Sequence, residues 1–165
     1  MIIVGIDPGI AIVGYGVVEY NKNRFVTLDC GAILTPAHTP VPDRLATIYS
    51  ALNQLFDMFN PTDIAVEELF FNTNQKTIIP VAEARGVILL AAKQHGLTIG
   101  EYTPLQVKQT VTGYGRADKK QVIEMVKRLL NLAKMPKLDD TADALAIAIT
   151  HAYSASSAIG KYYNN

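Results

Sequence analysis

The chain has 165 residues, of which 49% are hydrophobic and 18% are charged, and its formal net charge is zero. These values are typical of one compact domain that buries its own core, and they argue against a disordered chain. The sequence has no run of about eighteen apolar residues and no secretory signal pattern, and its single cysteine, Cys30, cannot form an internal disulfide. We therefore expect a cytoplasmic protein with no membrane contact.

The first predicted elements are three strands in meander order. Residues 1–6 form an apolar run that ends at Asp7, residues 12–18 form a second strand, and residues 24–34 form a third. A carboxylate at the end of a buried strand costs free energy unless another group compensates its charge. A metal ion is one such group, and a simple cap on the turn at Pro8-Gly9 is the alternative.

A helix and a short strand come next. The spacing of apolar residues predicts a helix that begins at Asp43 or just before it and stops at Asn60-Pro61. Residues 64–66 then form a short apolar strand, which Glu67 and Glu68 follow directly. The order of a strand followed by an acid is thus repeated.

Two aromatic residues and a long helix follow these acids. Phe70 and Phe71 open a polar stretch, where aromatic rings can stack on exposed bases, and packing of a ring under the loop is the alternative. Residues 77–94 predict a helix that is apolar nearly all round, with Pro80 in its first turn or at a kink. Such a helix needs burial on both sides, which a homodimer or a deep central position would supply.

The rest of the chain predicts a strand over residues 97–103, a short helix over 104–112 and an amphipathic helix over 118–130. Between Pro104 and Lys137, eight Lys or Arg residues accompany only two acids, Asp118 and Glu124. A basic segment beside clustered acids is typical of a metal-dependent enzyme that acts on a phosphate polymer. A solvated helix face is the alternative for any single lysine.

The last predicted helix starts at Asp139 and runs to about Tyr153, so we expect one domain over residues 1–153 and a loose tail over 154–165. Asp139 is the better N-cap candidate, and Asp140 and Asp143 are three residues apart, which places them on one helix face. Acids in a first turn often only complement the helix dipole.

This order of elements predicts an α/β fold with a mixed five-stranded sheet flanked by helices. If the first and fourth strands are neighbours and the last helix crosses them, Asp7, Glu67 or Glu68, Asp140 and Asp143 can meet. Clustered carboxylates repel one another unless cations lie between them, and oxygen ligands of this kind suit Mg²⁺ or Mn²⁺.

Six segments, taken in order, resemble one known family: GIDPG, GYGVV, AVEELFF, EARGV, VKQTVTGYGRADK and DDTADALAIAITHAY. Together they resemble the RuvC family of Holliday junction resolvases along nearly the whole chain. The resemblance implies an RNase H-like fold, a homodimer, and an endonuclease that resolves four-way DNA junctions by paired nicks with 5′-phosphate products. It also implies branch-migration proteins as partners.

The resemblance also implies roles for single residues. The acidic catalytic and metal-binding positions fall on Asp7, Glu67, Asp140 and Asp143, which would hold two Mg²⁺ ions, with Mn²⁺ as a substitute. The DNA-binding positions fall on Phe70, Lys108, Lys119 and Arg85, and we predict that Arg116 and Lys120 of the basic segment join them. Phe71 competes with Phe70 for the aromatic role.

Three other functions are consistent with parts of this pattern. An actin-like ATPase or sugar kinase also has an Asp-Gly turn after its first strand, but it needs two domains of this fold. A non-catalytic junction-binding or RNA-binding module would gain nothing from four acids facing a phosphate backbone. A resolvase-like nuclease acting on other branched nucleic acids is the third alternative.

Overall fold

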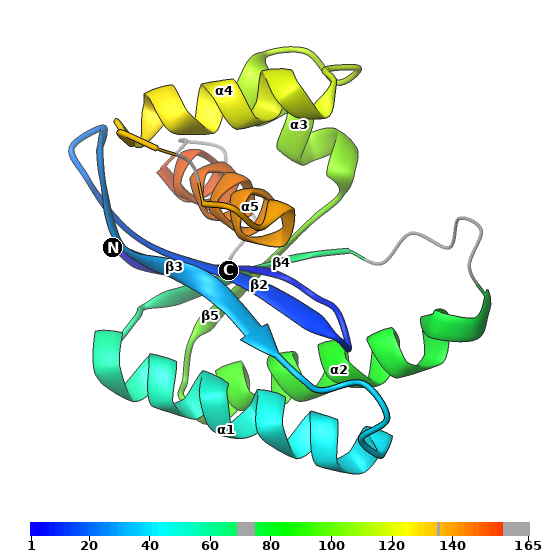
Figure 1. Ribbon diagram of the computed structural model, residues 1–165. Helices are drawn as coiled ribbons and strands as arrows, with labels where there is room; N and C mark the ends of the chain where they lie inside the picture. Colours follow the sequence, from blue (N-terminus) through cyan, green and yellow to red (C-terminus); the bar gives the residue numbers. More distant parts are fainter. Residues whose placement is uncertain (69–74, 135, 157–165) are drawn as a thin grey trace.

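The computed structural model describes residues 1–68, 75–134 and 136–156. A mixed sheet lies between two layers of helices (Figure 1). In chain order the elements are β1 (Ile2–Asp7), β2 (Ile12–Asn21), β3 (Arg24–Leu34), α1 (Val41–Phe59), β4 (Asp63–Glu67), α2 (Gln75–Gln94), β5 (Thr98–Tyr102), α3 (Pro104–Thr112), α4 (Lys119–Leu129) and α5 (Asp139–Ser156).

The strands are arranged in the order β3-β2-β1-β4-β5. The first three pair antiparallel as a meander, whereas β4 is parallel to β1 and β5 is parallel to β4. The mixed five-stranded sheet and the neighbouring first and fourth strands are confirmed. Because β1 and β4 are parallel, their carboxyl ends lie at the same edge of the sheet.

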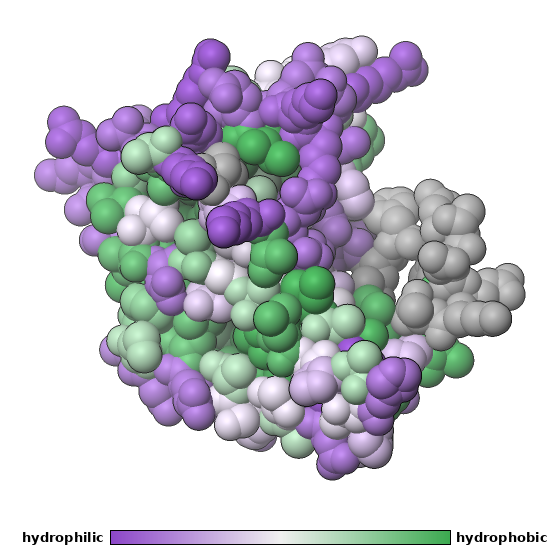
Figure 2. All heavy atoms as spheres, viewed as in Figure 1, coloured by the Kyte–Doolittle hydropathy of each residue, from purple (hydrophilic) through white to green (hydrophobic). Residues whose placement is uncertain are grey.

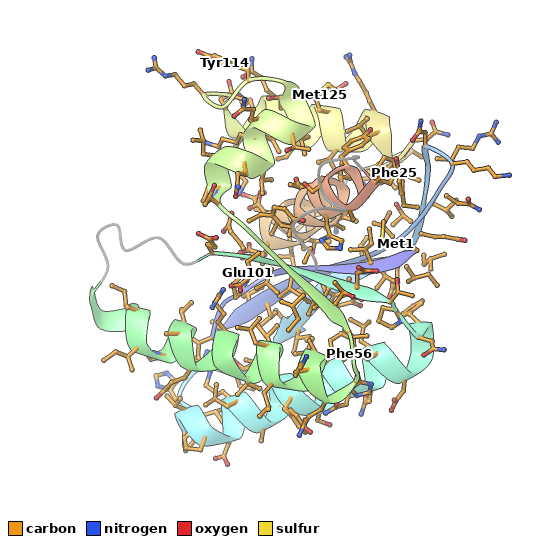
Figure 3. The ribbon with its side chains drawn as sticks, turned by 180° about the vertical axis from the view of Figure 1, so that it is seen from behind. Met1, Phe25, Phe56, Glu101, Tyr114 and Met125 are labelled. Atoms are coloured by element: carbon orange, nitrogen blue, oxygen red, sulfur yellow. The ribbon has the colours of Figure 1, made fainter. Side chains whose placement is uncertain are left out.

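Each face of the sheet has its own core. Helices α1 and α2 cover one face, where Phe56 and Ile88 share a buried cluster with Val4 of β1 (Figure 3). Helices α3, α4 and α5 cover the other, where Leu145 of α5 and Val126 of α4 share a second cluster. Helix α5 thus lies between the sheet and α4 (Figure 1).

Glycines let α5 lie directly on the strands. A Cβ added at Gly14 of β2 would clash with the backbone oxygen of Asp140, and one at Gly16 would lie 2.6 Å from the Leu145 side chain. The Thr141 hydroxyl donates a hydrogen bond of 3.0 Å to the Gly31 carbonyl oxygen of β3. The start of α5 is therefore held against the meander without intervening side chains.

Some element limits differ from the predicted ones. Strand β2 continues to Asn21, because its last residues pair with β3 across the hairpin beyond a bulge at Val17/Val18. Helix α2 already includes Gln75, and it is not a deep central helix, since Ile79 and Leu90 are 68% and 54% exposed. Among the residues that the structure describes, no helix is long and apolar enough to cross a membrane.

Candidate active site

Four carboxylates gather where two strands end and α5 begins. Asp7 is the last residue of β1, and Glu67 is the last residue of β4, so the parallel pairing of these strands places both acids at one edge of the sheet. Asp140 and Asp143 lie at the start of α5, which packs on β1, β2 and β4. The acids that the sequence predicted to meet thus come from three separate segments of the chain.

Asp7 has a strongly perturbed carboxyl group. The pKa of Asp7 is raised from 3.8 to about 8, mainly by burial and then by the negative charges of Glu67, Asp143 and Asp140, whereas Lys119 lowers it. Since all three other acids act on this carboxyl, Asp7 lies at the centre of the group. A cation among these side chains would favour the ionised form of Asp7.

Glu67 faces a cleft that carries two lysines. The pKa of Glu67 is raised from 4.5 to about 7, mainly by burial and then by the negative charge of Asp143, whereas Lys108 and Lys119 lower it. The cleft has a volume of about 300 Å³ and is lined by Glu67, Pro104, Val107, Lys108, Lys119, Val122 and Asp143. The neighbouring acid Glu68 does not line it, so the structure favours Glu67 as the acid of this centre.

Lys119 connects α4 to α5. Its Nζ atom lies 3.1 Å from a carboxylate oxygen of Asp143 and 3.2 Å from one of Asp139. The prediction that Asp139 caps the helix is wrong, because α5 already includes Asp139 and the carboxylate of this residue pairs with Lys119 instead.

The chemistry of these side chains fits a divalent cation. Four carboxylates supply only oxygen ligands, and the pKa values of two of them are raised to about 8 and about 7, first by burial and then by the neighbouring negative charges. Within the described residues, no three His, Cys, Asp or Glu side chains already stand close enough together to hold a metal ion. In the protein alone, the Asp143 carboxylate forms an ion pair with Lys119 of α4.

Two of the predicted DNA-binding residues line this cleft, and two others lie on or next to α4 outside it. Lys108 lies on α3 and lines the cleft together with Lys119, while Lys120 lines a separate hollow of about 430 Å³ on the outer side of α4. Arg116 is exposed in the connection from α3 to α4. Hydrophilic side chains gather over α4 at the top of the molecule (Figure 2).

Two other predicted DNA-binding residues have different outcomes. Arg85 of α2 forms an ion pair with Glu101 of β5 (Glu101 is labelled in Figure 3). The Arg85 Nε also donates a hydrogen bond of 3.5 Å to the backbone oxygen of Glu67. Arg85 thus supports the strand that carries Glu67, and contact with DNA stays a prediction. Phe70 and Phe71 lie outside the described residues.

Sequence reasoning missed three polar residues at the other end of α5. His151 of α5 lies between Asp63 of β4 and Tyr102 of β5, at hydrogen-bond distance from both. These residues are separated by 88 and 49 positions in the sequence, so no local spacing could have linked them. A histidine in an otherwise apolar stretch, ALAIAITHAY, was the only local signal.

A mixed sheet of this order, with acids at the ends of two parallel strands and lysines around the cleft, defines an RNase H-like nuclease. A family model described as crossover junction endodeoxyribonuclease RuvC matches residues 3–151. The chain therefore belongs to the RuvC family of endodeoxyribonucleases.

Individual relatives agree with this assignment. RuvC of Alkaliphilus oremlandii is 60% identical over 154 residues, which cover 93% of this chain and 94% of the relative. RuvC of Clostridioides difficile is 56% identical and covers 93% and 91% of the two chains. The structure of Thermus thermophilus RuvC in complex with Holliday junction substrate matches with a TM-score of 0.89 at 37% identity and covers 94% of each chain. A yeast mitochondrial Holliday junction resolvase, at 17% identity and a TM-score of 0.67, shares the fold.

Proposed function

We propose that this endonuclease resolves four-way DNA junctions by paired, metal-dependent nicks during recombination and repair. The observation that carries the proposal is the pair of acids at the ends of β1 and β4, whose pKa values are raised to about 8 and about 7 beside a cleft with two lysines. The Thermus thermophilus relative, which binds a Holliday junction substrate in its solved complex, supports the choice of substrate.

We assign Asp7, Glu67, Asp140 and Asp143 as the residues that hold two Mg²⁺ ions, with Mn²⁺ as a substitute. When bound, such ions activate the attacking water and stabilise the charge on the leaving 3′ oxygen, which gives 5′-phosphate products. Asp7 would be the central one of these ligands, because each of the other three acids acts on its carboxyl. The carboxylates must be ionised for this role, and the cations themselves favour ionisation.

In this proposal, lysine and arginine side chains bind and orient the DNA backbone. Lys108 and Lys119 reach the cleft beside Glu67, so they can contact the phosphates next to the bond that is cut. Arg116 and Lys120 extend this basic surface over the start of α4, where a DNA arm would pass. Such contacts supply affinity that weakens as the salt concentration rises. Stacking of Phe70 on an opened base pair is part of the same proposal.

Paired nicks need two active sites, and we propose that α2 forms the contact between two copies of the chain. Ile79, Gly86 and Leu90 recur at helical spacing on its exposed side, together with the charged Glu83, so two large apolar side chains of this helix face away from the core. Analytical ultracentrifugation should give twice the chain mass for the wild type and one chain mass for Leu90→Glu. A wild-type protein that sediments as one chain at micromolar concentration would remove the dimer.

We also propose that the enzyme works in the cytoplasm together with branch-migration proteins, because a mobile junction must be moved to a site that can be cut. Co-sedimentation of the wild-type protein with a junction already bound by such proteins tests this association. Loss of the nuclease from that complex would contradict it.

The deciding experiment compares a mobile four-way junction with the matching linear duplex, in Mg²⁺ or in EDTA, for the wild type and Asp7→Asn. We expect paired nicks in the junction alone, only with Mg²⁺, and a loss of at least about a thousandfold in the variant, since one acid of a metal centre is removed. Tight junction binding without cutting in any divalent metal would instead identify a non-catalytic binding module. Equal cutting of other branched substrates would identify a broader nuclease.

A further inference from the structure

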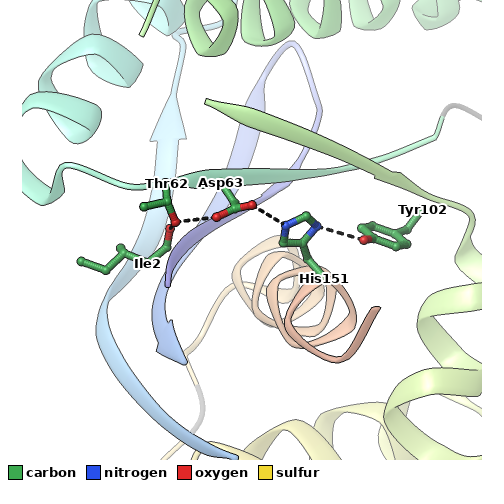
Figure 4. Close-up of polar contacts among 5 residues, drawn as sticks. All are labelled: Ile2, Thr62, Asp63, Tyr102 and His151. Carbon is green, nitrogen blue, oxygen red and sulfur yellow. Dashed lines mark hydrogen bonds and ion pairs between the residues drawn. The ribbon is translucent and has the colours of Figure 1, made fainter. Parts of the chain in front are cut away.

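A buried polar group lies at the end of α5 that is far from the carboxylates. His151 is 4% exposed, and its Nε2 lies 3.1 Å from a carboxylate oxygen of Asp63 on β4. Its Nδ1 lies 2.9 Å from the hydroxyl of Tyr102 on β5 (Figure 4). One histidine therefore connects a helix to two neighbouring strands.

This group of residues is closed by further hydrogen bonds. The Thr62 hydroxyl lies 2.5 Å from the second carboxylate oxygen of Asp63 and 3.2 Å from the backbone oxygen of Ile2 (Figure 4). Burial raises the pKa of Asp63, but hydrogen bonds from His151 and Thr62 lower it more, so the carboxylate stays ionised. An ionised Asp63 accepts a hydrogen bond from the Nε2–H of His151, and in this tautomer of the neutral ring Nδ1 accepts the hydrogen bond that the Tyr102 hydroxyl donates.

Asp, His and Tyr side chains in contact could suggest a catalytic group, but the packing argues for another role. The side chains of His151 and Asp63 retain only 6% and 13% exposure. A Cβ added at Gly100 of β5 would clash with the His151 ring, so the strand backbone covers this side of the histidine. With no room for a substrate, the polar contacts can only fix elements relative to one another.

The elements they fix are those that carry the active-site acids. Along β4, Asp63 and Glu67 are four residues apart, or about 13 Å at the rise of a strand. Along α5, His151 and Asp143 are eight residues apart, or about 12 Å at the rise of a helix. Asp63 and His151 join the two elements at one end. The distance from this joint to the active-site acid is therefore nearly the same along β4 as along α5.

The remaining contacts of α5 with the sheet are weakly directional. They run through glycines on the strands and through small or apolar residues on the helix, such as Ala144, Leu145 and Ala148. Apolar contacts of this kind tolerate a small shift of the helix along its axis, whereas hydrogen bonds do not. Two further polar contacts join α5 to the sheet: Thr141 binds β3 rather than β4, and Ser154 forms a hydrogen bond with the Tyr102 side chain of β5.

We propose that His151 is a positioning residue that, with Asp63 and Tyr102, fixes α5 along β4 and so sets the spacing of Asp140 and Asp143 from Glu67. The inference rests on the proposed carboxylate centre. It predicts that loss of these hydrogen bonds weakens metal binding and slows cutting without weakening the binding of junction DNA.

The test uses Tyr102→Phe and His151→Gln, with Ile149→Val as the control on the same helix. Tyr102→Phe removes a single hydroxyl, so it keeps the test valid even if the histidine variant fails to fold. Ile149 is fully buried in the apolar cluster, and its shortening loosens α5 without touching the hydrogen bonds. Two quantities are measured: the Mg²⁺ concentration that gives half of the rise in melting temperature, and kcat and KM for junction cleavage.

For Tyr102→Phe and His151→Gln we expect the Mg²⁺ midpoint to rise by about tenfold and kcat to fall, with KM for the junction unchanged. Ile149→Val should lower the melting temperature but leave the Mg²⁺ midpoint near that of the wild type. If all three variants keep the wild-type midpoint, or if all three shift it alike, His151 is not a positioning residue. A wild type that neither cuts nor gains stability with Mg²⁺ would overturn the carboxylate centre and this inference with it.

Discussion

The polar side chains at the two ends of α5 have opposite electrostatic surroundings. At its start, Asp140 and Asp143 lie near Asp7 and Glu67 beside a cleft that Glu67 and Asp143 line, and burial together with repulsion raises the pKa of the two strand acids. Toward its other end, His151 meets a single acid, Asp63, and a tyrosine in a closed site where each partner lies at hydrogen-bond distance. One helix therefore carries a group of acids that Lys119 compensates only in part and a single acid whose hydrogen bonds are complete.

The difference distinguishes a reactive site from a structural one. A protein that only had to fold would gain stability by replacing the four acids, because like charges held together in a buried place oppose folding. Their concentration at one edge makes sense when a cation or a phosphate completes the site. The opposite end needs no such completion, so its polar residues can act only on the geometry of the protein.

The largest expected effect comes from forcing α5 off the sheet at the carboxylate end. Gly14→Ala would place a Cβ against the backbone oxygen of Asp140, which has no rotamer that avoids it. We expect a loss of about 3 kcal/mol in the free energy of unfolding and loss of cutting, because the helix must shift with its acids. Urea unfolding and the junction cleavage assay measure both quantities.

Gly16→Ala is the matched comparison on the same strand. Its Cβ would lie 2.6 Å from Cδ2 and 2.9 Å from Cγ of Leu145, so the neighbour is a side chain that can adjust. This variant should therefore lose less stability than Gly14→Ala and keep measurable cutting. Equal losses of stability and cutting in the two variants would mean that a clash with the Asp140 backbone costs no more than a clash with the Leu145 side chain.

A second prediction uses pH to separate the two ends. Since the pKa values of Asp7 and Glu67 are raised from 3.8 to about 8 and from 4.5 to about 7, the folded protein keeps protons that the unfolded chain releases. Its stability is then highest at low pH and falls as pH rises from about 4 to 8. In EDTA we expect the melting temperature to drop by roughly 5 °C between pH 5 and pH 8.5.

Asp7→Asn should remove most of this drop, because the variant has no charge to bury at that position. The pKa of Asp63 is lowered, so its contribution is constant over this range and is lost only as the pH falls through that lowered value. Differential scanning calorimetry in EDTA measures the slope for both proteins. The same slope in wild type and variant would contradict the assignment of the raised pKa to Asp7.

Much of the carboxylate end could be predicted from the sequence, because its signals are local. A buried strand followed by an acid occurs twice, at Asp7 and at Glu67, and Asp140 and Asp143 have helical spacing. The limits of α3 and β3 were also predictable from turn and capping residues such as Thr103, whose hydroxyl accepts a hydrogen bond from the backbone N–H of Gln106.

The other end could not be predicted, because it depends on the direction of α5 across the sheet. His151 and Asp63 are 88 positions apart, and only the packing of the helix antiparallel to β4 brings them together. Gly14 and Gly16 show the same limit. In the sequence they lie within the second predicted strand, and the structure shows that their absent side chains make room for α5.

The smallest expected effect concerns Lys119, the cation that partly compensates the charged end. Its Nζ lies between the carboxylates of Asp139 and Asp143 in the protein alone, and the cleft it lines is where we place the DNA backbone. Metal ions on the acids would free this lysine for a phosphate. In Lys119→Met we expect junction affinity to fall several-fold and the slope of log K against log salt to decrease by about one.

Lys120→Met is the matched change one residue away, where the side chain lines the hollow on the outer side of α4 instead of the cleft. If the backbone next to the cut bond passes through the cleft, Lys119→Met should reduce cutting at saturating DNA and Lys120→Met should reduce only binding. Fluorescence anisotropy over a range of salt concentrations gives the slopes, and single-turnover cleavage gives the rates. Equal cutting rates for the two variants would mean that Lys119 contacts DNA away from the cut bond. A lysine that neutralises a phosphate releases a counterion on binding. An unchanged salt slope for Lys119→Met would therefore mean that Lys119 does not contact the DNA.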